Sequence, residues 1–82
     1  MSFTKHDLEL LSRVAKRNEH LMELILSDES KILIQYESQT HSWKIDRIGC
    51  DGFFYMNFYE NIQAILLELA PDTESVTLRK KP

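Results

Sequence analysis

The sequence predicts a small single α+β domain, in which two helices pack on an antiparallel sheet of three to four strands. The chain has 82 residues, enough for one hydrophobic core and too few for two domains. Apolar residues recur with helical spacing near the start and again in the last third, whereas the middle alternates as strands do. Strands in succession, rather than strict strand–helix alternation, favour the order α-β-β-β-α-β.

The first predicted element is a long helix over residues 5–26. Thr4 can cap its first turn, because Asp7 follows three residues later in the pattern of a capping box. The polar residues 27–30 predict its end. Six residues of this helix recur at alternating spacings of three and four, which is typical of a heptad seam: Leu8, Leu11, Ala15, Asn18, Met22 and Ile25.

The middle of the chain is predicted to form a three-stranded meander over residues 31–56. Its first two strands alternate β-branched and aromatic residues with polar ones, as Trp43 and Ile45 do. The dipeptide Asp51-Gly52 suits a tight hairpin turn, and the third strand follows over residues 53–56.

A second helix is predicted over residues 58–70, with Asn57 as its cap and Pro71 at its end. Its expected apolar face consists of Phe58, Ile62, Ile65, Leu66 and Leu69. The alternation in residues 75–79 predicts a short C-terminal strand. Positively charged side chains end this strand and follow it, so we expect it at a sheet edge. All these elements belong to one domain over residues 1–82.

The balance of charges argues against a nucleic-acid-binding domain. Ten basic and thirteen acidic residues give a net charge of −3, whereas affinity for nucleic acid depends largely on an excess of basic groups. No segment forms a basic arm, although Arg13, Lys16 and Arg17 could gather on one surface. We therefore expect no nucleic-acid partner.

Cysteine usage and apolar runs indicate a soluble cytoplasmic protein. Cys50 is the only cysteine, so one chain can form neither an internal disulfide nor a cysteine zinc cluster. The first residues lack the basic region and apolar run of a signal peptide. The longest apolar runs fall far short of the roughly 18 residues that span a bilayer, so we expect no membrane insertion.

The chain offers little that catalysis would need. Its two glycines, Gly49 and Gly52, are too few for a phosphate-binding loop. His6 and His20 would lie about 21 Å apart along one helix and could not share a metal ion, and His41 falls in a polar turn. We predict no catalytic, cofactor-binding or metal-binding residues, and therefore a protein that is not an enzyme.

Asn18 is the most unusual residue of the first predicted helix. A single Asn within an apolar seam can fix the register and oligomeric state of paired helices. It favours a homodimer in which the helices of two copies meet. The alternative is a helix with a solvated centre, or one that kinks at Asn18 into two shorter helices.

Aromatic residues crowd into residues 53–59. In a strand, Phe54 and Tyr55 point to opposite faces, so we expect one to enter the core and the other to lie exposed. Tyr59 and Leu67 fall outside the apolar stripe of the second helix. This surplus predicts an interaction surface, unless loops and the C-terminal strand cover it. The candidate residues for partner binding or self-association are Leu11, Asn18, Met22, Phe54, Tyr55, Tyr59 and Leu67.

These features favour a small acidic interaction module, a regulator that binds another protein and associates with itself. Size, acidity and spare apolar surface suggest an accessory protein of a phage or mobile element that modulates a target protein. The alternative is a small-ligand-binding domain or minor enzyme that uses a cleft between the sheet and the helices.

Overall fold

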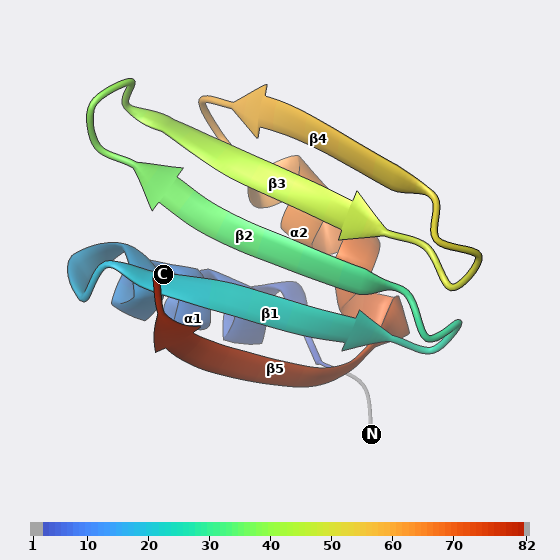
Figure 1. Ribbon diagram of the computed structural model, residues 1–82. Helices are drawn as coiled ribbons and strands as arrows, with labels where there is room; N and C mark the ends of the chain where they lie inside the picture. The colour runs from blue at the N-terminus through green and yellow to red at the C-terminus, as the bar shows by residue number, and fades with distance from the viewer. Residues whose placement is uncertain (1–2, 82) are drawn as a thin grey trace.

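In the computed structural model, which describes residues 3–81, a five-stranded antiparallel sheet carries both helices on one face (Figure 1). The elements in chain order are α1 (Lys5–Arg17), β1 (His20–Leu26), β2 (Lys31–Glu37), β3 (Ser42–Ile48), β4 (Phe54–Tyr59), α2 (Gln63–Leu69), the 3₁₀ helix η1 (Ala70–Asp72) and β5 (Thr73–Lys80). The predictions for residues 1–2 and 82, at the two ends of the chain, lie outside the described residues.

The α+β class is confirmed, with five strands where three to four were predicted. The strand order is β4-β3-β2-β1-β5, so the chain leaves the meander at one edge and returns through α2 to the other. β5 pairs antiparallel with β1 and lies at the edge of the sheet, as its basic C-terminal residues predict.

The additional strand comes from the second half of the predicted first helix, so the helix over residues 5–26 is wrong. Helix α1 ends at Arg17, Asn18 is its C-cap, and Glu19 turns the chain with a φ of 56°. Residues His20–Leu26 form β1 instead. β1 pairs with β2 on one side and with β5 on the other, so its backbone N–H and C=O groups are hydrogen-bonded within the sheet. This long-range pairing decides the structure against the helical spacing of the apolar residues.

Met22 explains why spacing alone was misleading. It falls on the helical seam, but it also alternates with Leu24 and Leu26 on one face of β1, and all three side chains are buried. Asn18 therefore belongs to no helical seam. The homodimer through paired first helices loses its structural basis.

The meander is confirmed, but its last strand is longer than predicted. Gly52 turns the β3–β4 hairpin with a φ of 87°. β4 runs to Tyr59 rather than residue 56, so Asn57 pairs with Ile45 in the sheet instead of capping a helix. Helix α2 begins only at Gln63. Phe58 consequently lies on the sheet and not on the apolar face of α2.

The core fills the space between the sheet and the helices. α1 contributes Leu8 and Ala15, and α2 contributes Leu66 and Leu69, all of them buried. Beneath them, the apolar residues of the three central strands point toward the helices. The buried core consists of Leu8, Ala15, Met22, Leu24, Leu26, Ile32, Ile34, Ile45, Ile62, Leu66, Leu69 and Ala70.

The predicted capping box is present at the start of α1. The Thr4 hydroxyl accepts the Asp7 backbone N–H at 3.1 Å, and the Asp7 carboxylate accepts the Thr4 N–H at 2.9 Å. A similar bond pattern holds the β1–β2 turn, where the Asp28 carboxylate accepts from both the hydroxyl and the backbone N–H of Ser30. These hydrogen bonds hold the pKa of each carboxyl below its ordinary value of 3.8.

Acidification is therefore expected to destabilise the protein through Asp7 and Asp28. Because both folded-state pKa values are depressed, the stabilisation is complete above about pH 4 and is lost as the pH falls through them. Thermal unfolding between about pH 6 and about pH 2 measures this loss. The wild-type Tm should fall more steeply than that of the Asp7→Asn, Asp28→Asn double variant, and parallel slopes would contradict this assignment.

Candidate functional site

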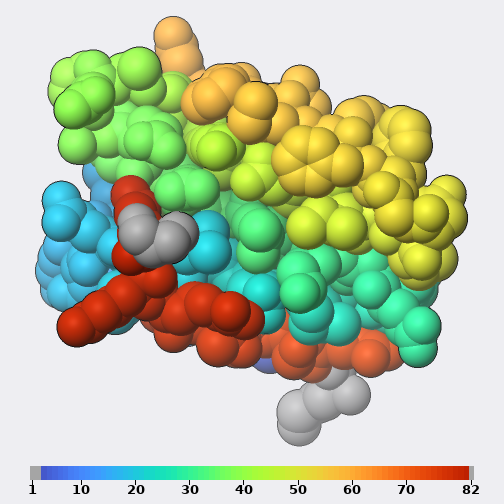
Figure 2. All heavy atoms as spheres, in the orientation of Figure 1, coloured from blue at the N-terminus to red at the C-terminus, as the bar shows by residue number. Residues whose placement is uncertain are grey.

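In the described part of the chain, no helix covers the face of the sheet opposite α1 and α2, here the open face (Figure 1). Figure 2 shows it in the same orientation, with the side chains of β4 in yellow and orange along one edge. The register places Phe54, Met56 and Phe58 of β4 on this face, and their side chains are 57%, 48% and 55% exposed. Three large apolar side chains thus lie in a row on this face, and the largest exposed apolar patch of a domain often has a function.

Asp46 lies buried in the middle of this apolar surface. It is 8% exposed, and the sheet register places Leu33 of β2 on one side of it and Met56 of β4 on the other. Within residues 3–81, no group donates a hydrogen bond to its Oδ1 atom. Lys44, on the same face of β3, forms no ion pair with it. Burying a carboxylate oxygen without a partner costs free energy.

Glu23 provides a contrast on the same face of the sheet. It is also buried, but its carboxylate accepts a hydrogen bond from Arg79 at 2.7 Å and lies 3.8 Å from the Lys31 ammonium. Arg79 and Lys31 come from the two strands that flank β1. Within residues 3–81, cationic side chains thus pair with Glu23 but not with Asp46.

We call the surface around Asp46 the open-face patch. Its apolar members flank Asp46 from three strands, and within residues 3–81 neither Lys44 nor any other cationic side chain forms an ion pair with the carboxylate. Such a surface can bind an apolar group that also carries a cation. The patch consists of Leu33, Asp46, Ile48, Phe54, Met56 and Phe58.

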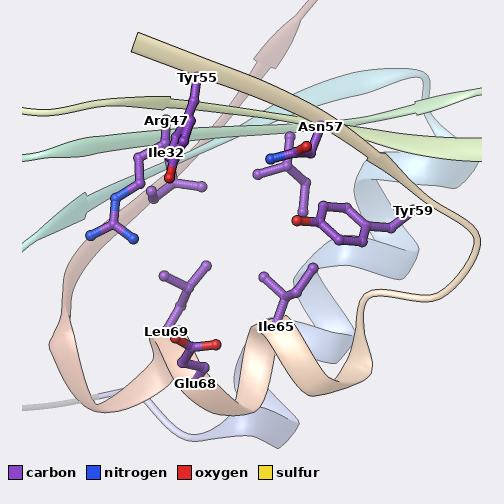
Figure 3. A pocket seen from close by; sticks show the side chains of 9 residues that line it. Ile32, Arg47, Tyr55, Asn57, Tyr59, Ile65, Glu68 and Leu69 are labelled. Carbon is purple, nitrogen blue, oxygen red and sulfur yellow. The ribbon is translucent and has the colours of Figure 1, made fainter. Parts of the chain in front are cut away.

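A second candidate site is a cavity of about 200 Å³ between the sheet and α2. Figure 3 shows Tyr55, Asn57 and Tyr59 of β4 on one side of it and Glu68 of α2 on the other. The Arg47 side chain also points into this space, whose remaining lining is apolar. This is the predicted cleft between sheet and helices, although it is smaller than the roughly 300–1,000 Å³ of most ligand pockets.

The structure separates most of the side chains that catalysis or metal binding would need. His6 lies in α1, His20 in β1 and His41 in the β2–β3 turn. In residues 3–81, no three His, Cys, Asp or Glu side chains form a group that could hold a metal ion. None of the described helices is long and apolar enough to cross a membrane.

The predicted interaction residues do not form one surface. Met22 is fully buried beneath the helices, so it is unavailable to a partner, and Leu11 is half-buried against the core. Asn18 caps α1. Leu67 is exposed on α2, which packs on the opposite face of the sheet from the open face.

The prediction that either Phe54 or Tyr55 enters the core is wrong. Both are exposed, because α2 covers only part of the sheet and leaves β4 at its rim. Phe54 joins the open-face patch, whereas Tyr55 and Tyr59 line the cavity. Asp46 could not be identified from the sequence, because its alternation with Ile45 and Arg47 is that of an ordinary solvent-facing strand residue.

Comparison of the chain with protein-family models, with curated proteins and with solved structures finds no match.

Proposed function

We propose that the protein is a non-enzymatic protein-binding module whose binding site is the open-face patch. The single observation that carries this proposal is the buried Oδ1 of Asp46, which has no hydrogen-bond partner within residues 3–81 and lies beside the apolar residues Leu33, Ile48 and Met56. Its expected partner is a protein surface that inserts an Arg or Lys side chain among apolar contacts. A guanidinium would give Asp46 a hydrogen bond like the one that Glu23 receives from Arg79.

The surrounding aromatic residues suit the same partner. Phe54 and Phe58 offer ring faces to a cation and large areas to apolar neighbours. Side chains of this kind, together with a desolvated charge at the centre, often carry most of the binding energy of an interface. Both side chains are exposed at the edge of the sheet and are therefore accessible to a partner.

Substitutions in the open-face patch are expected to weaken partner binding by at least about tenfold. Asp46→Asn removes the charge with little change of shape, and Phe58→Ser removes an aromatic contact. Leu67→Ser is the matched control, because Leu67 is equally exposed but lies on α2. Tagged proteins are isolated from the native cell, bound proteins are quantified by mass spectrometry, and the affinity for the dominant partner is then titrated.

Retention of the partner by Leu67→Ser but not by the two patch variants supports the proposal. Equal binding by all three variants would overturn it, as would selective loss with Leu67→Ser. A regulatory role follows if binding changes the activity of the partner.

The proposal extends to the cellular setting of the protein. We propose that it associates with itself and acts in the cytoplasm, as an accessory regulator of the kind that phages and mobile elements encode. An exposed free thiol supports the location, because Cys50 would remain reduced there. The exposed apolar residues of β4 support the self-association.

Small-ligand binding is the second candidate function, and the cavity beneath β4 favours it. Arg47, Asn57, Glu68 and two tyrosine hydroxyls surround an apolar floor, an arrangement that suits a small polar ligand. A metabolite retained through purification, with no stoichiometric protein partner, would favour this function over the first.

A further inference from the structure

The two edges of the sheet differ in how they are protected against pairing with another chain. β5 carries Glu74, Arg79 and Lys80, the kind of charged side chains that discourage edge pairing. β4 has the sequence Phe-Tyr-Met-Asn-Phe-Tyr, which contains no charge, no proline and no glycine. Of the two edges, only β4 is chemically suited to accept another strand.

The register shows which backbone groups β4 presents outward. The Gly49 N–H donates to the Phe53 carbonyl at 2.7 Å, which makes Gly49 and Phe53 a hydrogen-bonded pair of the β3–β4 ladder. Hydrogen-bonded and non-hydrogen-bonded pairs alternate in an antiparallel ladder. The N–H and C=O groups of Phe54, Met56 and Phe58 therefore point away from β3.

These outward groups have no partner within the described residues. No turn or loop backbone group and no side chain bonds to them. Residues 53–58 are all exposed, and Figure 1 shows β4 as the outermost strand at its edge of the sheet. Three residues with free donors and acceptors thus alternate with three that bond to β3.

We infer that β4 pairs antiparallel with β4 of a second copy of the chain, with the two Met56 residues facing each other on a two-fold axis. Phe54 would then lie opposite Phe58 of the partner subunit. The three pairs so formed would exchange six backbone hydrogen bonds. The two sheets would join into one sheet of ten strands with all helices on one face.

The side-chain face and the hydrogen-bond direction, which alternate together along the strand, exclude odd shifts of the register, and the number of pairs selects among the even ones. An axis perpendicular to the sheet keeps the open faces of both copies on the same side, so open-face residues must pair with open-face residues. The outward N–H and C=O groups belong to those same residues, so the hydrogen bonds form in the same register. A slip of one residue would violate both conditions, and a slip of two would leave fewer pairs.

A second copy would also enlarge the exposed apolar surface. With roughly 200 Å² for each full side chain, Phe54, Met56 and Phe58 expose about 300 Å². This is well below the roughly 800 Å² per partner of a stable interface. Pairing would place the two open-face patches side by side and double the continuous apolar surface. The inference rests on the self-association included in the proposed function, but it needs no other partner.

Cysteine cross-linking tests the register directly. In a Cys50→Ser background, Met56→Cys would place two Cα atoms about 5.5 Å apart across the axis, within the range of a disulfide. Phe54→Cys is the matched control, because its two copies would lie about 13 Å apart along the strands. We expect Met56→Cys to form at least about tenfold more disulfide dimer than Phe54→Cys.

A mixture of the Phe54→Cys and Phe58→Cys proteins should cross-link, since these positions face each other in the paired strands. Equal cross-linking of Met56→Cys and Phe54→Cys would indicate random collision and overturn the inference. Absence of cross-linking at Met56 would also overturn it. Circular dichroism confirms that each variant is folded.

A proline scan gives a second readout by light scattering coupled to size exclusion. The N–H of Met56 points outward, so Met56→Pro should leave a folded monomer while wild type is a dimer at micromolar concentration. The N–H of Asn57 points toward β3, so Asn57→Pro should destabilise the monomer itself. A monomeric wild type, or a Met56→Pro variant that still dimerises, would overturn the inference.

These experiments separate the pairing from the proposed function. If Met56→Cys fails to cross-link but partner binding still depends on Asp46, the pairing is wrong and the function stands. If the cross-link forms but no partner binds the open-face patch, the function is wrong and the pairing stands.

Discussion

Truncation of Leu24 to alanine is expected to lower the free energy of unfolding by about 2–5 kcal/mol, whereas Ile25→Ala should cost much less. Leu24 is fully buried against the helices in β1. Ile25 lies on the opposite, open face and is only half-buried. The loss at Leu24 combines the removed apolar contacts with the cavity that remains in a well-packed core.

This pair of variants also distinguishes a strand from a helix over residues 20–26. A continuous first helix would place Ile25 on the apolar seam and Leu24 off it, so the order of the two effects would reverse. Urea titration of both variants measures the difference from the midpoints, provided that the slopes stay equal. A larger loss for Ile25→Ala would contradict the described position of β1.

Replacing Asp46 with leucine is expected to raise the free energy of unfolding by about 1–3 kcal/mol and to abolish partner binding. The substitution removes a buried carboxylate oxygen that lacks a hydrogen-bond partner and adds an apolar group next to Leu33 and Met56. A gain in stability with a loss of binding is typical of a residue retained for function.

Glu23→Leu is the control for this effect. Glu23 is buried on the same face, but Arg79 and Lys31 already compensate its charge, so its replacement should stabilise the protein far less than Asp46→Leu. Thermal and urea unfolding of the two variants give the comparison. A lower stability for Asp46→Leu than for wild type would show that the carboxylate has a structural role.

The parts of the fold that could be predicted from the sequence depend on local interactions. The capping box joins Thr4 and Asp7, and the β3–β4 hairpin turns at a glycine with a positive φ. The edge position of β5 follows from its own charged residues. Each of these signals lies within a few residues of the structure that it predicts.

The boundary between α1 and β1 could not be predicted because long-range pairing decides it. Met22 fits both a helical seam and a strand face, and only the strands on either side of β1 favour the second. The turn that separates α1 from β1 uses Glu19 in the left-handed region, where glycine or asparagine would be the usual signal. The sequence contains neither signal at that position.

The candidate site was predicted only in part, for a similar reason. The aromatic surplus near Phe54 indicated an interaction surface from composition alone. The role of Asp46 depends on Leu33 and Met56, which precede and follow it by 13 and 10 residues and reach it only through the sheet register. A buried carboxylate cannot be recognised from its own segment, which alternates as exposed strands do.

The pairing of β1 with β5 sets the order in which the protein can fold. Residues such as His20 and Lys80 are 60 positions apart, so this pairing closes the largest loop of the sheet. Because closure of a long loop costs entropy, the β2–β3 and β3–β4 hairpins should form earlier than the β1–β5 contact. During synthesis, β1 lacks one of its two neighbours until β5 has left the ribosome. A chain truncated before Thr73 would expose the backbone edge of β1, so aggregation would follow loss of the C-terminal strand.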